Sequence, residues 1–435
     1  MSDTVPEPPA RIHPRAAFQH RDFRVFQASK FISTIGWLMQ VTAVGYQVYS
    51  ITHSKLDLGY IGLASFLPAI LFSLLTGHVA DRFDRRGVMM VCMSIMIAGS
   101  LALMGISLME IPPAWPFLSH IHGMPTAQTW PFLVILFVTG AAHAFYGPAS
   151  QALMPQLVPQ VHFANAVAWN STIWQASAIL GPAVGGLVYY QMGGPAAVYG
   201  ADAALTSLAF LLMGLLHMRT GRMEMRAASW STLLAGLHFI WKRKIILGAI
   251  SMDLFAVLLG GATALLPVYA QDILHVGEAG FGLMRSAPAM GAAITALIVT
   301  HLPPMQRAGA TMLVCVAIFG VATIAFGVST NFWFSMACLV TMGAADMVSV
   351  VIRHTVVQML TPPEMRGRVS AVNLVFIGAS NELGEFESGV TAHWFGTVPA
   401  VVIGGVGTLM VVGLWAFMFP QLRKYKRLDV AEDIH

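Results

Sequence analysis

The stretch Gly62-Leu-Ala-Ser-Phe-Leu-Pro-Ala69 recurs 220 residues later as Gly282-Leu-Met-Arg-Ser-Ala-Pro-Ala289, with the same Gly-Leu at its start and the same Pro-Ala at its end. Further along the chain the offset falls to 203 residues, as in the match of Leu180-Gly181 with Leu383-Gly384. One offset covers the first two apolar segments of each half, and the other covers the fourth and fifth. Self-similarity at fixed offsets indicates an internal repeat, so we expect two related halves.

Each half contains six apolar segments that are long enough to cross a bilayer. Charged residues make up only 10% of the chain, hydrophobic residues make up 56%, and the mean hydropathy is +0.69. A soluble chain has about 25% charged residues. In lipid the apolar side chains face hydrocarbon, and a helical backbone satisfies its own hydrogen bonds. The expected segments are 25–51, 59–80, 87–109, 130–153, 164–191, 196–217, 246–271, 279–301, 308–328, 332–358, 368–393 and 398–419.

These segments predict an all-α integral membrane protein whose 12 transmembrane helices form two pseudo-symmetric six-helix bundles. Parallel six-helix repeats are the architecture of many secondary transporters, which place a substrate site between the two halves. The expected organisation is a cytoplasmic tail at 1–24, a first bundle at 25–218, a cytoplasmic linker at 219–244, a second bundle at 245–420 and a cytoplasmic tail at 421–435.

Basic residues are concentrated on one side of the predicted membrane. If the N-terminus is inside, the basic residues of 11–24, 82–86, 219–244 and 423–427 are all cytoplasmic, whereas only Lys55 lies in a loop on the other side. This asymmetry predicts a multi-pass protein of a bacterial inner membrane with both termini in the cytoplasm. It also accounts for the net charge of +4, so no nucleic-acid partner is expected.

Cysteine and histidine usage predicts no metal site, cofactor or disulfide framework. All three cysteines lie inside apolar segments: Cys92, Cys315 and Cys338. His120 and His122 lie in a proline-rich stretch between segments three and four, where we expect an exposed loop rather than a metal site. Lys30, near the cytoplasmic end of the first segment, is expected to extend its amine to the membrane surface.

The stretch Gly77-His-Val-Ala-Asp-Arg-Phe-Asp-Arg-Arg86 lies between segments two and three. A tight turn of this composition has carboxylates and guanidiniums that pair with each other or cap a helix end. It resembles motif A of the major facilitator superfamily, although Asp84 stands where a glycine is usual. The resemblance implies a contact that holds the outward-facing state, and the alternative is a solvated turn. The implied gating residues are Gly77, Asp81, Arg82, Arg85 and Arg86.

Segment five contains the run Ser177-Ala-Ile-Leu-Gly-Pro-Ala-Val-Gly-Gly186. Glycines four residues apart let two helices approach closely, and the proline frees a backbone carbonyl. The run resembles the antiporter motif of exporters in the same superfamily, which implies export. Close helix packing alone is the alternative. The implied hinge residues are Gly181, Pro182, Gly185 and Gly186.

Three carboxylates lie within segment eleven, in the run Ser380-Asn-Glu-Leu-Gly-Glu-Phe-Glu-Ser-Gly389. An acidic residue at a helix centre costs about 2.5–3.5 kcal/mol on insertion scales. We therefore expect these side chains to face the bundle interior, to have cationic partners or to be protonated. Glu382 and Glu385 are three residues apart and share a helix face, whereas Glu387 points elsewhere.

Further ionisable residues lie at membrane depth in other segments. Arg285 is at the depth of the segment-eleven carboxylates, and Asp346 and Arg353 are seven residues apart on one helix face. These groups are either structural ion pairs or sites where a carboxylate released from its arginine takes up a proton. The candidates for transport and proton coupling are Glu382, Glu385, Glu387, Asp346, Arg353, Asp253 and Arg285.

His143 and Tyr146, in the middle of segment four, are the candidates for the substrate cavity. The alternative for His143 is a buried, hydrogen-bonded histidine without a functional role. Segment four contains no arginine, although the proton-coupling motif B of related antiporters places one there.

The runs Phe18–Arg24, Glu364–Asn373 and Asn381–Gly389 together resemble the enterobactin-exporter branch of the major facilitator superfamily, and the resemblance extends over nearly the whole chain. It implies the major facilitator fold and secondary active export of a siderophore or drug by alternating access, with proton coupling. A lipid flippase and an uncoupled facilitator are alternatives. A membrane enzyme or receptor is disfavoured, since no Walker A, HExxH or GxSxG motif is present. The expected partners are a small molecule, the bilayer and H⁺, and the chain is expected to be a monomer.

Overall fold

The computed structural model describes residues 15–109, 127–217, 230–301 and 306–425. His120 and His122 lie outside the described residues. Within these ranges the chain is helical and contains no strand. The N-terminal half consists of α1 (Arg21–Thr52), α2 (Lys55–Leu71), α3 (Ser73–Arg82), α4 (Arg85–Ser107), α5 (Trp130–Leu153), α6 (Phe163–Gln191) and α7 (Pro195–Gly214).

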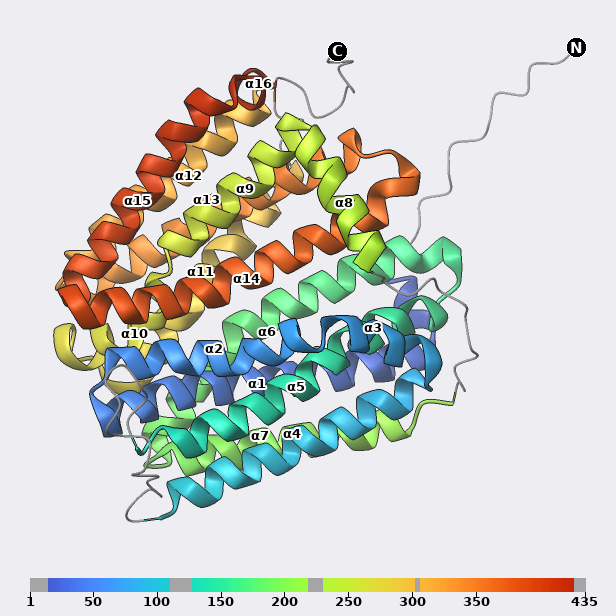
Figure 1. Ribbon diagram of the computed structural model, residues 1–435. Coiled ribbons are helices and arrows are strands. Elements are labelled where there is room, and N and C mark those ends of the chain that lie inside the picture. Colours follow the sequence, from blue (N-terminus) through green and yellow to red (C-terminus); the bar gives the residue numbers. More distant parts are fainter. Residues whose placement is uncertain (1–14, 110–126, 218–229, 302–305, 426–435) are drawn as a thin grey trace, which may run out of the picture.

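The C-terminal half begins after α8 (Trp230–Lys242), a helix that packs against α9 and α14. In Figure 1 this half is the yellow-to-red bundle above the blue-to-green bundle of α1–α7. Its elements are α9 (Lys244–Leu259), η5 (Ala262–Leu265), α10 (Leu266–Val268), η6 (Tyr269–Ile273), α11 (Gly277–His301), α12 (Ala308–Gly327), α13 (Phe332–Leu360), α14 (Pro363–Phe395), α15 (Thr397–Met418) and α16 (Pro420–Lys424).

Two of the membrane crossings are interrupted. The helix that begins at Lys55 breaks at Phe72, four residues after Pro68, and continues as α3. The crossing that begins at Lys244 passes from α9 through η5 and α10 into the π-helical turn η6. Proline removes a backbone donor and crowds the preceding turn, which makes such breaks common where other helices re-satisfy the backbone. Counted as single crossings, these elements give the 12 crossings that the sequence predicts.

Eight of the crossings are apolar and long enough to span a bilayer by themselves. The other four are α1, the α2–α3 pair, α6 and α14. These four lie where the bundles meet, because α2 packs against α14, α6 packs against α11, and α1 contacts α10 and α11. A helix that faces another helix rather than lipid can carry polar side chains at lower cost. Helix α11 also lies at this interface although it is one of the eight apolar crossings, so hydropathy alone does not give the position of a crossing.

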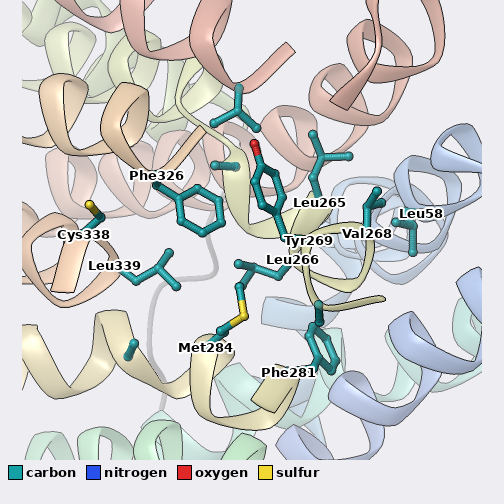
Figure 2. Close-up of a cluster of buried hydrophobic side chains, with 14 of the residues drawn as sticks. Leu58, Leu265, Leu266, Val268, Tyr269, Phe281, Met284, Phe326, Cys338 and Leu339 are labelled. Carbon is teal, nitrogen blue, oxygen red and sulfur yellow. The ribbon is translucent and has the colours of Figure 1, made fainter. Parts of the chain in front are cut away.

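The bundles meet at one end of the molecule, which we call the turn end. It is the end at which α1 passes into α2 through His53, whose φ of 48° is left-handed, and it lies at the left of Figure 1. The opposite end, where α1 begins and α16 lies, is the terminal end. At the turn end a hydrophobic cluster joins Tyr46, Tyr49 and Leu58 of the first bundle to residues of the second. Figure 2 shows Tyr269, Phe281, Met284 and Phe326 among these residues.

Candidate functional site

The α6–α11 interface brings two backbones into contact. A methyl group added at Gly282 would lie 2.5 Å from the carbonyl oxygen of Pro182 and 2.9 Å from the Cα of Gly186. Neither atom belongs to a flexible side chain, so only glycine fits. Of the predicted hinge residues, Pro182 and Gly186 therefore contact α11 of the other bundle directly.

The remaining glycines of the same run face a different helix. A methyl group at Gly181 would lie 2.5 Å from the Cβ of Leu38, and one at Gly185 would lie 2.9 Å from the Cα of Met39. Both partners belong to α1. Helix α6 is therefore packed between α1 of its own bundle and α11 of the other, and each side depends on small residues.

The α2–α14 interface is built in the same way but contains carboxylates. A methyl group at Gly389 would lie 2.9 Å from the Cα of Gly59, which is again a contact between backbones. One turn further on, a methyl group at Gly62 would lie 2.9 Å from Oε2 of Glu385 and 3.7 Å from Oε2 of Glu382. These two carboxylates therefore share the face of α14 that is turned toward α2.

The third carboxylate of segment eleven is separate from this pair. Glu387 accepts a 2.7 Å hydrogen bond from the hydroxyl of Thr391, one turn along its own helix. Arg285 of α11 is near enough to interact electrostatically with Glu382. In the part of the chain that the structure describes, however, Arg285 forms no ion pair with any of the three.

A buried ion pair lies within the second bundle. Asp253 of α9 pairs with Arg353 of α13, and only 5% and 2% of these residues are exposed. Asp346, which the spacing placed on the same helix face as Arg353, interacts electrostatically with both members but is not the ion-pair partner. Removing one partner of such a pair leaves the other as a buried charge without a counter-charge. The three residues thus form one group of interacting charges, held by an ion pair between helices that the sequence spacing did not reveal.

The first bundle contains a cavity of about 460 Å³. Both residues predicted for the substrate cavity, His143 and Tyr146, line it, and the ring of His143 lies 4.7 Å from the ring of Trp37. Trp174 also lines the cavity, and 48% of this side chain is exposed, so the cavity opens to the outside of the bundle. The other lining residues include Lys30, Ser33, Thr34, Gln40, Met96, Ser150, Gln151, Asn170, Asp202 and Thr206.

Two charged residues of this cavity were not assigned to a site from the sequence. Lys30 does not extend to the membrane surface as expected, because its amine donates a 2.7 Å hydrogen bond to Oδ1 of Asn170 inside the cavity. Asp202 of α7 accepts hydrogen bonds from the hydroxyls of Ser100 (2.6 Å) and Thr206 (3.1 Å). Spacing along one helix cannot reveal such contacts, since every partner except Thr206 lies on another helix.

The turn between α3 and α4 is fixed by contacts within the first bundle. Asp84 caps α4 by accepting a 2.9 Å hydrogen bond from the amide of Gly87. Arg85 donates to the carbonyl of Ala152, and Arg86 donates to the carbonyls of Gly214 and Leu216 at the end of α7. No described atom lies within 4 Å of a methyl group added at Gly77, and Arg82 is exposed. The side chain of Asp81 lies outside the described residues.

Hydrogen bonds at the turn end also join the bundles. The hydroxyl of Tyr49 donates to a carboxylate oxygen of Asp272. The side-chain amide of Gln271 donates to the hydroxyl of Ser50 (2.8 Å) and to the carbonyl of Tyr46 (3.3 Å). Asp272 and Gln271 belong to the π-helical turn η6, and such turns are frequent at functional sites. These contacts tie α1 to the second bundle and were not predicted from the sequence.

Comparison with known proteins identifies relatives over the full extent of this architecture. A family model described as "Transmembrane secretion effector" matches residues 12–435. The enterobactin exporters EntS of Citrobacter koseri and of Escherichia coli O1:K1 are each 24% identical over 413 residues, which cover 94% of this chain and 94% of each relative.

Solved structures with the same fold include several transporters. A bacterial homologue of the human lysosomal transporter Spinster, inward-facing and occupied, has a TM-score of 0.71 and 13% identity over 93% of this chain and 98% of its own. A D-xylose–proton symporter has a TM-score of 0.67 and 13% identity, over 93% of this chain and 99% of the symporter. A bacterial homologue of the iron transporter ferroportin, in its inward-facing state, has a TM-score of 0.65 and 15% identity, over 93% of this chain and 99% of the homologue. At these identities the likeness shows the fold alone.

Proposed function

Because the chain belongs to the transmembrane secretion effector family of the major facilitator superfamily, whose members are membrane transporters and not enzymes, we propose that it is a secondary active exporter. Its cargo is a small amphiphilic molecule of the siderophore or drug class, and it works by alternating access in the bacterial inner membrane. The names of the relatives support export and the siderophore class. The protein acts as a monomer, with its cavity inside a single chain.

The observation that carries this proposal is the location of the contacts between the bundles. The glycine contacts of the α6–α11 and α2–α14 interfaces, the hydrophobic cluster and the Tyr49–Asp272 hydrogen bond all lie toward the turn end. The cavity of the first bundle has an exposed wall at Trp174. A molecule closed at one end and open at a polar cavity is one state of an alternating-access cycle.

The positive-inside distribution supports placing both termini in the cytoplasm. With this orientation the turn end faces the periplasm, and the structure corresponds to an inward-facing state that receives substrate from the cytoplasm. In the opposite state the turn end opens and the terminal end closes. The turn at Gly77–Arg86 then holds that state, with Asp81, Arg82 and the arginines beside it as gating residues.

Proton coupling depends on the carboxylates at the α2–α14 interface. In the closed turn end Glu382 and Glu385 lie against Gly62, and separation of α2 from α14 exposes both to the opposite side. Two neighbouring carboxylates are unfavourable when both are buried and ionised, so the pair holds a proton while it is buried and exchanges it with the side to which it becomes exposed. Asp253, Arg353 and Asp346 form a second group of interacting charges in the same bundle, and Arg285 supplies positive charge near Glu382.

The test is reconstitution of the purified chain into liposomes, with and without an imposed proton gradient. The substrate is first identified by comparing the metabolites in media from cells with and without the chain. Accumulation that requires the gradient supports the proposal. Equilibration of the substrate across the membrane, at a rate independent of the gradient, indicates an uncoupled facilitator. Movement of fluorescent phospholipid between leaflets indicates a flippase. Either of these outcomes contradicts proton-coupled export.

A further inference from the structure

The cavity of the first bundle contains two opposite charges, and neither has an ion-pair partner among the described residues. The amine of Lys30 contacts the neutral amide of Asn170, and the carboxylate of Asp202 contacts the hydroxyls of Ser100 and Thr206. The second bundle differs, since its Asp253 and Arg353 neutralise each other. Burying a charge without a counter-charge is costly, so a compensating group is expected in the cavity.

The two charges lie at different depths of the same cavity. A methyl group added at Gly36 of α1 would lie 2.4 Å from Oδ1 of Asp202, which places this carboxylate beside Gly36. Lys30 is six residues earlier on α1, which corresponds to about 9 Å along the helix axis. The two side chains therefore do not form an ion pair, and a ligand of moderate length spans the distance between them.

Aromatic rings line the same cavity. Trp37 lies 4.7 Å from His143 and 6.2 Å from Trp174, measured between ring centroids. All three residues line the cavity, and Trp37 follows Gly36 directly in the chain. Rings in this arrangement bind the apolar or aromatic body of a ligand.

Among the polar groups at the cavity that have no hydrogen-bond partner in the described part of the chain, two belong to residues that are almost fully buried. They are the side-chain Nε2 of Gln40 and the hydroxyl of Ser150, in residues that are only 5% and 2% exposed. A buried polar group without a partner is unfavourable, and most such groups in proteins are satisfied. These two therefore indicate that a ligand with polar atoms completes the site.

We propose that this cavity binds a zwitterionic aromatic molecule, with its anionic end at Lys30, its cationic end at Asp202 and its aromatic body against Trp37. A purely anionic ligand leaves Asp202 unpaired, and a purely cationic ligand leaves Lys30 unpaired. Only a ligand with both charges neutralises both ends. This inference rests on the proposed export function and specifies the substrate class of the same cavity.

The experiment measures binding to the purified full-length chain in detergent micelles by isothermal titration calorimetry. Three probes share one aromatic body: the dipeptide phenylalanyl-phenylalanine, its methyl ester, which lacks the anion, and its N-acetyl derivative, which lacks the cation. We expect the dipeptide to bind at least about tenfold more tightly than either derivative, because each lost ion pair leaves a protein charge uncompensated. Equal affinities, tighter binding of a derivative, or no binding of any probe overturns the proposal.

Two variants assign each charge to its residue. Lys30→Gln should remove the advantage of the dipeptide over the methyl ester while leaving the affinity for the ester unchanged. Asp202→Asn should remove the advantage over the N-acetyl derivative and leave the affinity for that derivative unchanged. Lys242→Gln, which removes an exposed cation of α8, is the matched control and should change nothing. A variant that lowers the affinity for all three probes equally contradicts the role assigned to that residue.

The unmodified chain with three probes gives a decisive result even if a variant does not fold. The outcome is also separable from that of the proposed function. Export is measured in liposomes, whereas charge selectivity is measured at equilibrium without transport. Gradient-driven export without charge selectivity overturns only the substrate class, and charge-selective binding without export overturns only the transport proposal.

Discussion

The α6–α11 and α2–α14 interfaces are equivalent by the internal repeat but differ in chemistry. The 220-residue offset relates Gly62 of α2 to Gly282 of α11, and the 203-residue offset relates Pro182 of α6 to Glu385 of α14. In the structure, Gly282 contacts the carbonyl of Pro182, and Gly62 contacts the carboxylate of Glu385. The same pair of positions is therefore used twice, once as a neutral backbone contact and once as a contact with an ionisable group.

This difference separates two tasks. Backbones in contact without flexible side chains have one close-packed arrangement. Under the proposed mechanism we therefore expect the α6–α11 interface to determine whether the turn end can close. A carboxylate changes its charge and its hydration when the helices separate, so the α2–α14 interface is suited to proton coupling. The repeat supplied both pairs of helices, and divergence placed the ionisable groups on one of them.

The largest effect should come from Gly282→Ala. The added methyl group would lie 2.5 Å from a backbone oxygen, and overpacking of this kind costs about 1–3 kcal/mol. We expect this cost to open the turn end. If the overpacking cost lies in the upper part of the range, transport should fall at least about tenfold. Leu58→Cys in a cysteine-free background reports the opening, because Leu58 is buried in the turn-end cluster and reacts with a thiol reagent only when the cluster separates.

Two matched substitutions make this comparison quantitative. Gly62→Ala at the equivalent position should have a smaller effect, since the carboxylate of Glu385 can rotate away from the new methyl group. Gly413→Ala in α15 should have none, because no atom of another described residue lies within 4 Å of the methyl group that it adds. If Gly62→Ala and Gly282→Ala impair transport equally, the two interfaces do not have separate tasks.

Glu385→Gln should affect coupling rather than closure. The amide has nearly the same shape as the carboxyl group but cannot release a proton, so gradient-driven transport should be lost while substrate exchange without a gradient continues. Transport of labelled substrate into proteoliposomes, with and without the gradient, measures the two activities separately. Membrane insertion should be normal. Gradient-driven transport at the unmodified rate would remove Glu385 from the coupling mechanism.

Tyr49→Phe should have an intermediate effect at the turn end. It removes the hydroxyl that donates to Asp272, and a hydrogen bond to a charged group contributes about 1.5–3 kcal/mol. The hydrophobic cluster remains, so we expect partial opening, seen as faster labelling of Leu58→Cys, and retained coupling. Unchanged labelling would show that this hydrogen bond does not hold the turn end closed.

Glu387→Gln should have the smallest effect. Glu387 receives its hydrogen bond from Thr391 on the same helix, and the oxygen of a glutamine side chain accepts the same bond. We expect a change in stability within about 0.5 kcal/mol and unchanged gradient-driven transport in the same liposome assay. A loss as large as that of Glu385→Gln would mean that all three carboxylates of α14 form one coupling group.

The sequence predicted several features of the candidate site because they depend on position along one helix. The three-residue spacing of Glu382 and Glu385 predicted a shared face, and the structure places both at Gly62. The family resemblance made His143 and Tyr146 candidates for a substrate cavity between the halves. Both line the cavity of the first bundle, and their contact with substrate stays a prediction. Contacts between helices were harder to predict. Arg353 pairs with Asp253 rather than with its own-helix neighbour Asp346.

The same limitation explains the error at Lys30 and the contacts of the α3–α4 turn that the sequence did not predict. A lysine near the end of a membrane helix normally extends to the surface, but Lys30 has Asn170 within reach on α6. The arginines of the turn were predicted to act in gating. The contacts of Arg85 and Arg86 with the ends of α5 and α7 show that they also fix the first bundle internally.

The sequence by itself determined the helical membrane fold, the number of crossings and the repeat, because hydrophobicity and periodicity are properties of each segment alone. It also determined that α14 carries charges that lipid would not tolerate. Only the tertiary structure showed that Glu382 and Glu385 face α2 and which charges were neutralised. It also showed that Lys30 and Asp202 share one cavity. These features depend on side chains from different helices meeting across a few ångströms, and no spacing along a single helix encodes that distance.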